Sequence, residues 1–145
     1  MMDLQAAIGI HQLARVEANW QRRVAIWQRY NAAFADLPVD LPAPFEPDTR
    51  HGHHLYTLHI DEARCGISRD DFLEAMNQRR IGTGVHYLSV PEHRYYRERF
   101  GWTPDAWPNA MRIGRSTVSL PLSPSLQASN VEHIVATVQS ILTSV

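Results

Sequence analysis

Apolar residues recur every three or four positions along the first quarter of the chain. This spacing matches the 3.6-residue period of a helix and predicts one amphipathic helix, with Asp3 placed to cap its start and Pro38 just beyond its end. About 32 residues would span roughly 48 Å, which is longer than the core of a domain this size requires. The helix is therefore expected to contact a further partner. The positions that define its apolar face are Leu4, Ile8, Val16, Trp20, Val24, Trp27, Tyr30 and Phe34.

A proline-rich segment follows the long helix. Prolines at 38, 42, 44 and 47 exclude a helix there and indicate an extended connector. The boundary between the two parts of the chain is placed where this proline-rich segment begins. Residues 1–37 form the long helix, and residues 38–145 form a small C-terminal domain, the two making one compact unit.

Short strands and helices alternate over the rest of the chain without a repeat. Strands are predicted at residues 54–60, 85–90 and 118–120 from their β-branched and aromatic content. The fold class is therefore α+β: the long helix is followed by a small, mainly antiparallel sheet of about three strands, covered by helices. Helical segments are predicted to begin at Ser68, His93, Pro108 and Ser129 or Asn130.

Charge and composition exclude several classes of protein. The chain has 145 residues, 44% of them hydrophobic, and a formal net charge of −1 at pH 7. The chain therefore has no excess positive charge with which to bind a phosphate backbone, so nucleic acid is not an expected partner. No apolar run approaches the roughly 20 residues of a spanning helix, and the first residues do not resemble a signal peptide. A cytoplasmic protein without membrane attachment is expected.

All fourteen basic residues are arginines, and no lysine occurs in the sequence. A Schiff base with an aldehyde cofactor requires a side-chain primary amine, which the delocalised guanidinium of arginine cannot supply. A single cysteine, Cys65, cannot form an internal disulfide, and it is interpreted as a structural residue. The sequence therefore offers no side chain that could hold an aldehyde cofactor covalently, and no role as a nucleophile is expected for Cys65.

Histidines cluster in the segment that leads into the first strand. Consecutive residues of a strand point to opposite faces, so His53 and His54 would not ligate one ion together. No site for a metal ion is therefore expected, although a metal-binding domain remains as a third hypothesis. That hypothesis would use His51, His53, His54 and His59.

Polar aromatic residues concentrate between positions 82 and 96. Gly82 and Gly84 permit a close backbone approach, and the side chains that follow could donate hydrogen bonds to the oxygens of a sugar-like ligand. The same pattern also suits a helix end and aromatic packing on the core, and the residues alone do not decide between these interpretations. The candidate ligand-binding residues are His86, Tyr87, His93 and Tyr95.

Several segments, in this order, resemble the nucleotide-sugar aminotransferases of the DegT/StrS type, which are fold-type-I enzymes that depend on pyridoxal phosphate. The similarity covers nearly the whole chain. The resembling segments are MDLQAAIG at 2–9, the arginine-rich stretch 22–31, HLY at 54–56, IGTGVHY at 81–87 with Tyr95-Tyr96, and SLPL at 119–122.

The resemblance implies a C-terminal domain that forms the substrate side of the enzyme. In that family an N-terminal domain holds pyridoxal phosphate through its lysine, so this chain alone is expected to be inactive and to bind no cofactor covalently. His86, Tyr87 and His93, with Tyr95 as a weaker candidate, are implied to bind the nucleotide-sugar and not to catalyse. The long helix is expected to bind a second copy or the missing large domain. The alternative is a non-catalytic sugar-nucleotide-binding or dimerisation module that partners a complete aminotransferase.

Overall fold

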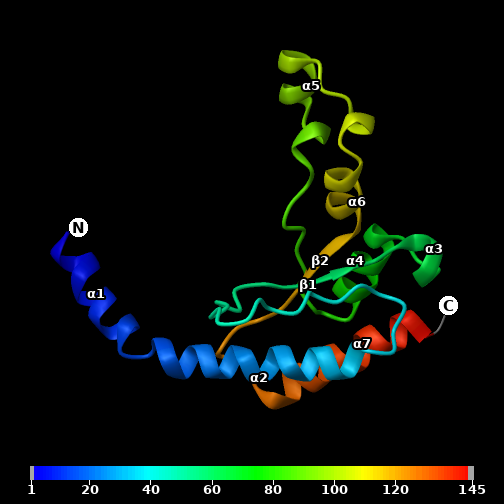
Figure 1. Ribbon diagram of the computed structural model, residues 1–145. Coiled ribbons are helices and arrows are strands. Elements are labelled where there is room, and N and C mark those ends of the chain that lie inside the picture. The colour runs from blue at the N-terminus through cyan, green and yellow to red at the C-terminus, as the bar shows by residue number, and fades with distance from the viewer. Residues whose placement is uncertain (1, 144–145) are drawn as a thin grey trace.

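A computed structural model describes residues 2–143 and shows an α+β fold (Figure 1). Strand β1 (Tyr56–His59) pairs with strand β2 (Thr117–Leu120), and short 3-10 turns lie at η1 (Val90–Glu92) and η2 (Pro104–Ala106). The α-helices in the described range are α1 (Asp3–Leu13), α2 (Val16–Phe34), α3 (Glu62–Cys65), α4 (Arg69–Gln78), α5 (Arg94–Phe100), α6 (Pro108–Ser116) and α7 (Ala128–Thr143).

The sheet is smaller than the expected three strands. Within residues 2–143 it contains two antiparallel strands, in which Tyr56 lies opposite Leu120. The predicted strand at 85–90 is wrong: its start is marked only by an isolated bridge in which Gly84 and Ser119 exchange both backbone hydrogen bonds, at 3.1 and 2.8 Å. Beyond Gly84 the chain turns away from β2, so residues 85–90 have no neighbouring strand to satisfy their backbone groups.

The predicted long helix is also corrected, because it is interrupted between Leu13 and Val16. No proline or glycine causes this break. Instead, the Arg15 side chain donates from Nε to the carbonyl oxygen of His11 at 3.3 Å, and its backbone N–H bonds to Gln12 at 3.1 Å. A side chain that takes part in the helical ladder can bend a helix. No residue of α1 is buried, so no contact with the core holds it in line with α2.

An aromatic core joins β1 to α2. The fully buried Tyr56 ring lies edge-on to Trp27 at 4.9 Å and to Tyr30 at 5.0 Å. Both phenols are hydrogen-bonded: Tyr56 donates to Asn31 Oδ1 at 2.8 Å, and Tyr30 donates to the carbonyl of Pro121 at 3.0 Å. Helix α2 therefore covers one face of the sheet, and α7 packs beside α2 on the same side (Figure 1).

The connector between α2 and β1 is held against α2 by a buried histidine. The His53 ring is only 5% exposed, lies perpendicular to Trp27 at 5.0 Å, and bonds through Nδ1 to the carbonyl of His51 at 2.9 Å. Burial, which penalises a charged imidazolium, lowers the pKa of His53 below its ordinary value. The folded chain therefore favours neutral His53.

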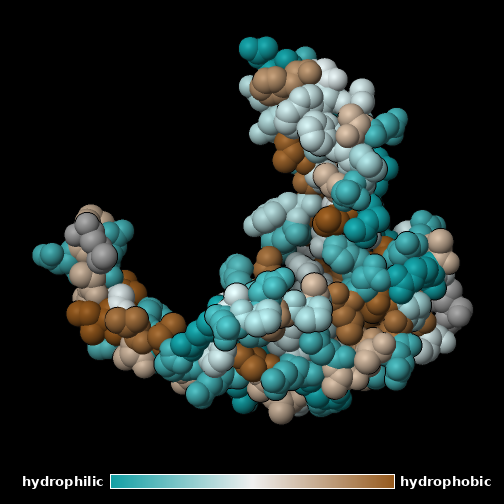
Figure 2. Space-filling model, in the orientation of Figure 1, coloured by the Kyte–Doolittle hydropathy of each residue, from teal (hydrophilic) through white to brown (hydrophobic). Residues whose placement is uncertain are grey.

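An arm formed by residues 85–116 projects away from the sheet and carries η1, α5, η2 and α6 (Figure 1). Its two sides meet closely at the base. A Cβ atom at Gly114 would lie 2.7 Å from the backbone nitrogen of Ser89, so only glycine fits there. Ser89 Oγ also donates to the carbonyl of Ala110. Figure 2 shows an open, concave side between this arm and α1.

We expect the folded state to lose stability in mild acid because of His53. Its folded pKa is lower than the 6.5 of an ordinary histidine, so the unfolded chain binds more protons between these two values. Stability is present above about pH 6.5 and falls as the pH drops through the folded pKa. Thermal unfolding followed by circular dichroism should give a melting temperature several degrees lower at about pH 5 than at about pH 7.5.

The matched variants are His53→Asn and His11→Asn. Asparagine tolerates the positive φ of 47° at position 53 but does not titrate, so this variant should melt lower at neutral pH and show a smaller acid loss. His11 lies exposed on α1, and its replacement should keep the wild-type acid loss. An unchanged acid loss in His53→Asn would show that another group is responsible.

Candidate functional site

His86 is fixed at the edge of the sheet by its neighbours in the fold. Its Nδ1 lies 2.9 Å from Ser119 Oγ, directly beside the bridge between Gly84 and Ser119. A Cβ atom at position 84 would lie 2.8 Å from the Cε1 atom of His86, so glycine lets the imidazole fold back over the main chain. No hydrogen bond within residues 2–143 uses His86 Nε2, which leaves this nitrogen for a ligand.

Tyr87 stands next to His86 and faces solvent. Its side chain is 75% exposed, and its ring lies perpendicular to the His86 imidazole at a centroid distance of 5.0 Å. The neighbouring strands present Thr57 opposite Ser119 on the face that points away from the α2 core, because strand side chains alternate between faces. The sheet is therefore polar at the base of the arm, where Ser119 is buried and Thr57 is half-buried.

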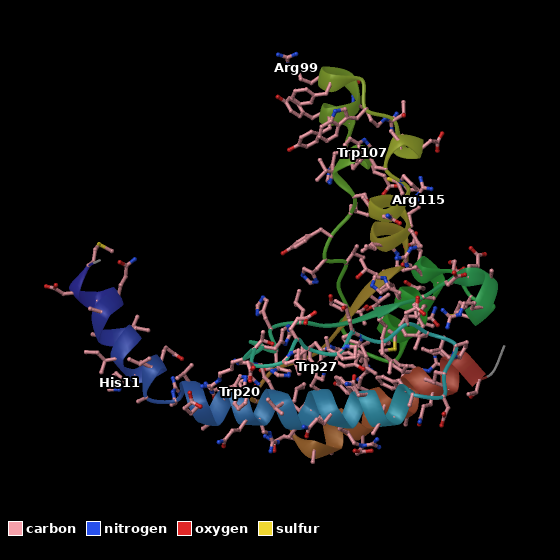
Figure 3. The ribbon with its side chains drawn as sticks, in the orientation of Figure 1. His11, Trp20, Trp27, Arg99, Trp107 and Arg115 are labelled. Carbon is pink, nitrogen blue, oxygen red and sulfur yellow. The ribbon has the colours of Figure 1, made fainter. Side chains whose placement is uncertain are left out.

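His93 and Tyr95 lie elsewhere, at the far end of the arm. His93 precedes α5, and Tyr95 is 63% exposed within it. Tyr95 contacts the rings of Tyr96 and Phe100 at 5.4 and 6.2 Å, as part of an aromatic cluster that continues to the labelled Trp107 (Figure 3). In the described part of the chain, no ring contact or hydrogen bond joins this pair to His86 or Tyr87, so the structure separates the four predicted residues into two places.

A further polar region on the sheet was not predicted to bind a sugar-like ligand, although His59 was part of the metal-binding hypothesis. His59 and Thr57 alternate with the buried Leu58 and Tyr56, so both lie on the outer face with His86. Burial lowers the pKa of His59, and the nearby positive charge of Arg112 lowers it further. The alternation of core and polar residues in segment 56–59 is the sequence signal that could have identified this face.

The histidine cluster does not form a metal centre in the described structure. His53 turns its ring into the core, whereas His54 is exposed. Over residues 2–143, no group of three or more His, Cys, Asp or Glu side chains is arranged to hold a metal ion. Cys65 is buried as well, its thiol lies 3.0 Å from the carbonyl of Pro38, and burial raises the pKa of this thiol.

Among the described residues, no helix is both long enough and apolar enough to cross a membrane.

The profile of the DegT/DnrJ/EryC1/StrS aminotransferase family matches residues 1–139. A curated relative, the spore coat polysaccharide biosynthesis protein SpsC of Bacillus subtilis strain 168, is 41% identical over 144 residues. The match covers 98% of this chain but 37% of SpsC, so the chain spans little more than a third of that relative's length.

Solved structures share the fold. Spr1654 from Streptococcus pneumoniae superimposes with a TM-score of 0.88 at 26% identity, covering 99% of this chain and 36% of Spr1654. DesV from S. venezuelae, solved in complex with a ketimine intermediate, gives a TM-score of 0.81 at 28% identity, covering 94% and 35% of the two chains. Spr1654 is also known in a PLP form and a PMP form.

The residues of this chain do not fit pyridoxal phosphate as a covalently held cofactor. The sequence has no lysine, and the guanidinium groups of its fourteen basic residues cannot form the required imine. His86 and Tyr87 offer hydrogen-bonding groups of the kind that hold a polar ligand. The family profile, the curated relative and the shared fold together show that this chain belongs to the DegT/DnrJ/EryC1/StrS aminotransferase family.

Proposed function

We propose that the chain forms the nucleotide-sugar side of an aminotransferase active site and works only together with a partner domain that carries pyridoxal phosphate. The observation that carries this proposal is the pairing of His86 with Ser119 on a polar face, in a family member without lysine. The partner supplies the reactive amine and the cofactor. This chain binds and orients the substrate and takes no covalent part in the reaction.

The chemistry of this polar face suits the hydroxyl groups of a sugar. The bond to Ser119 fixes the His86 imidazole, so little side-chain entropy is lost when His86 Nε2 binds a ligand. Tyr87 adds an exposed phenol that can donate or accept. His93 and Tyr95 are proposed to approach the same substrate from the arm, where their exposure leaves them accessible.

UDP-glucose tests the binding role directly. We expect ligand-observed NMR to detect weak, millimolar binding to the full chain, because only one wall of the site is present. His86→Ala should weaken it about tenfold, as expected for the loss of one hydrogen bond to a charged or strongly polar ligand group. His133→Ala is the control, since that histidine lies on α7 and bonds to the Arg79 carbonyl. Equal binding by the His86 variant would contradict the proposal.

Treatment with pyridoxal phosphate and borohydride tests the need for a partner. We expect no adduct on any side chain, because the chain offers no side-chain primary amine. Peptide mapping by mass spectrometry separates this result from modification of the terminal α-amino group. A reduced adduct on an internal peptide would refute the proposal that the reactive amine comes from elsewhere.

Helix α1 is proposed to be the surface that binds the partner. Leu4, Ile10 and Leu13 are 70%, 69% and 73% exposed, and apolar exposure on this scale is unusual for a monomer. Figure 2 shows the apolar residues of this helix lying against no other element. Spr1654, a chain almost three times as long, shares the fold over 99% of this chain, which supports α1 as a segment that is covered in a larger assembly.

We expect the isolated chain to hide this surface by self-association. Light scattering should show oligomers for the wild type and monomers for Leu4→Glu/Ile8→Glu, because the added charges cannot be buried in an interface. Circular dichroism should show that the variant remains folded, since α1 contains no buried residue. Gln12→Glu adds a charge to the same helix without removing an apolar side chain, and it should remain oligomeric. A monomeric wild type would count against this role.

A further inference from the structure

A cavity of about 610 Å³ lies beside the polar face of the sheet, between α2, the connector and β1. Its size falls within the range of roughly 300–1,000 Å³ that is usual for small-molecule sites. Among the described residues that line it, none is Asp, Glu, Lys or Arg. The cavity therefore presents no permanently charged side chain to a ligand, and histidines and Thr57 supply its polar side chains.

One wall of this cavity is aromatic. Phe45 and His51 stack with a centroid distance of 4.4 Å and an interplanar angle of 16°. The buried Trp27, which projects from α2 toward the connector in Figure 3, supports both rings at centroid distances of 5.7 and 5.3 Å. Phe45 remains 43% exposed, so a planar ligand ring can still reach the aromatic wall. Such walls favour flat, polarisable rings.

The hydrogen-bond network assigns a donor to His51. Its Nδ1 accepts from the backbone N–H of His53 at 3.1 Å. A neutral imidazole carries its proton on the other nitrogen in that case, so Nε2 of His51 is a donor. This donor belongs to the same ring that forms the aromatic wall.

The network also assigns an acceptor to His59. Ser116 Oγ donates its single proton to the carbonyl of Arg112 at 2.7 Å, and it therefore accepts from His59 Nδ1 at 3.0 Å. Nε2 of His59 is then left without a proton and can accept a hydrogen bond. An aromatic wall, a donor and an acceptor together match the flat, uncharged ring of a nucleobase, which displays both kinds of group on its edge.

The cavity adjoins the proposed sugar site. Thr57, which lines the cavity, lies directly opposite Ser119, the partner of His86, and such cross-strand neighbours have Cβ atoms about 4.5–5.5 Å apart. We propose that this cavity binds the nucleobase of the nucleotide-linked sugar, an inference that rests on the proposed function of the chain. The base would stack on Phe45 and His51, while the sugar reaches His86.

Uridine, which has neither a phosphate nor the transferred sugar, tests the cavity alone. We expect NMR titration of the full chain to give a Kd on the order of 1 mM, with a shift of the ¹⁵N signal of His59 Nε2 on binding. Phe45→Ala should weaken binding about tenfold, because base stacking on an aromatic side chain is lost. His51→Phe keeps a ring in the wall but removes the donor, and it should also bind more weakly.

His133→Ala should bind uridine as the wild type does, and circular dichroism confirms that each variant is folded. The proposal is overturned if uridine does not bind in the millimolar range, if both wall variants bind normally, or if methyl glucoside binds better than uridine. If uridine does not bind but UDP-glucose binds in a way that depends on His86, the base site is rejected and the proposed sugar site is retained. Uridine binding through Phe45, with UDP-glucose binding insensitive to His86, would instead reject the proposed sugar site.

Discussion

The burial of Tyr56 against α2 is the contact on which the rest of the structure depends. Its ring meets Trp27, Tyr30 and Phe34, and its hydroxyl is satisfied by Asn31, so β1 can lie in only one register on the helix. A slip of one residue would turn Thr57 inward and Tyr56 outward, because strand side chains alternate. The same contact that forms the core therefore sets which residues face the ligand side, and through Ser119 it also positions His86.

The spacing and type of residues along the chain predicted the helices and the strand that bury one face. The 3.6-residue spacing identified α2 and α7, and the composition of segment 54–60 identified β1, because burial on one face leaves a mark in the sequence. The break at Arg15 left no such mark, since it depends on one side chain bonding to a carbonyl four residues earlier. The false strand at 85–90 had suitable residues but lacked a partner strand, which is a property of the tertiary structure.

The candidate site was predictable to the extent that its residues lie together in the chain. Gly82 and Gly84 beside a run of polar aromatic residues indicated a close backbone approach, and at Gly84 a Cβ atom would lie 2.8 Å from Cε1 of His86. The cavity could not be predicted in this way, since Trp27, Phe45 and His59 come from three separate segments. Of the histidines that suggested a metal centre, His51 and His53 bond to backbone groups and His59 bonds to Ser116.

All basic residues other than histidine in this chain are arginines. A basic residue can form ion pairs or act as an amine nucleophile, and arginine serves only the first of these roles. Arg29 makes a bidentate ion pair with Glu132 at 2.8 and 2.6 Å, which links α2 to α7 across the sequence. A planar guanidinium suits this geometry better than an ammonium group does. A guanidinium cannot form an imine, however. The basic residues of this chain can therefore form ion pairs but cannot act as amine nucleophiles. The aromatic residues of the core are buried, whereas α1 contains no buried residue. A partner that covers α1, as proposed above, would bury apolar side chains that the folded chain leaves exposed.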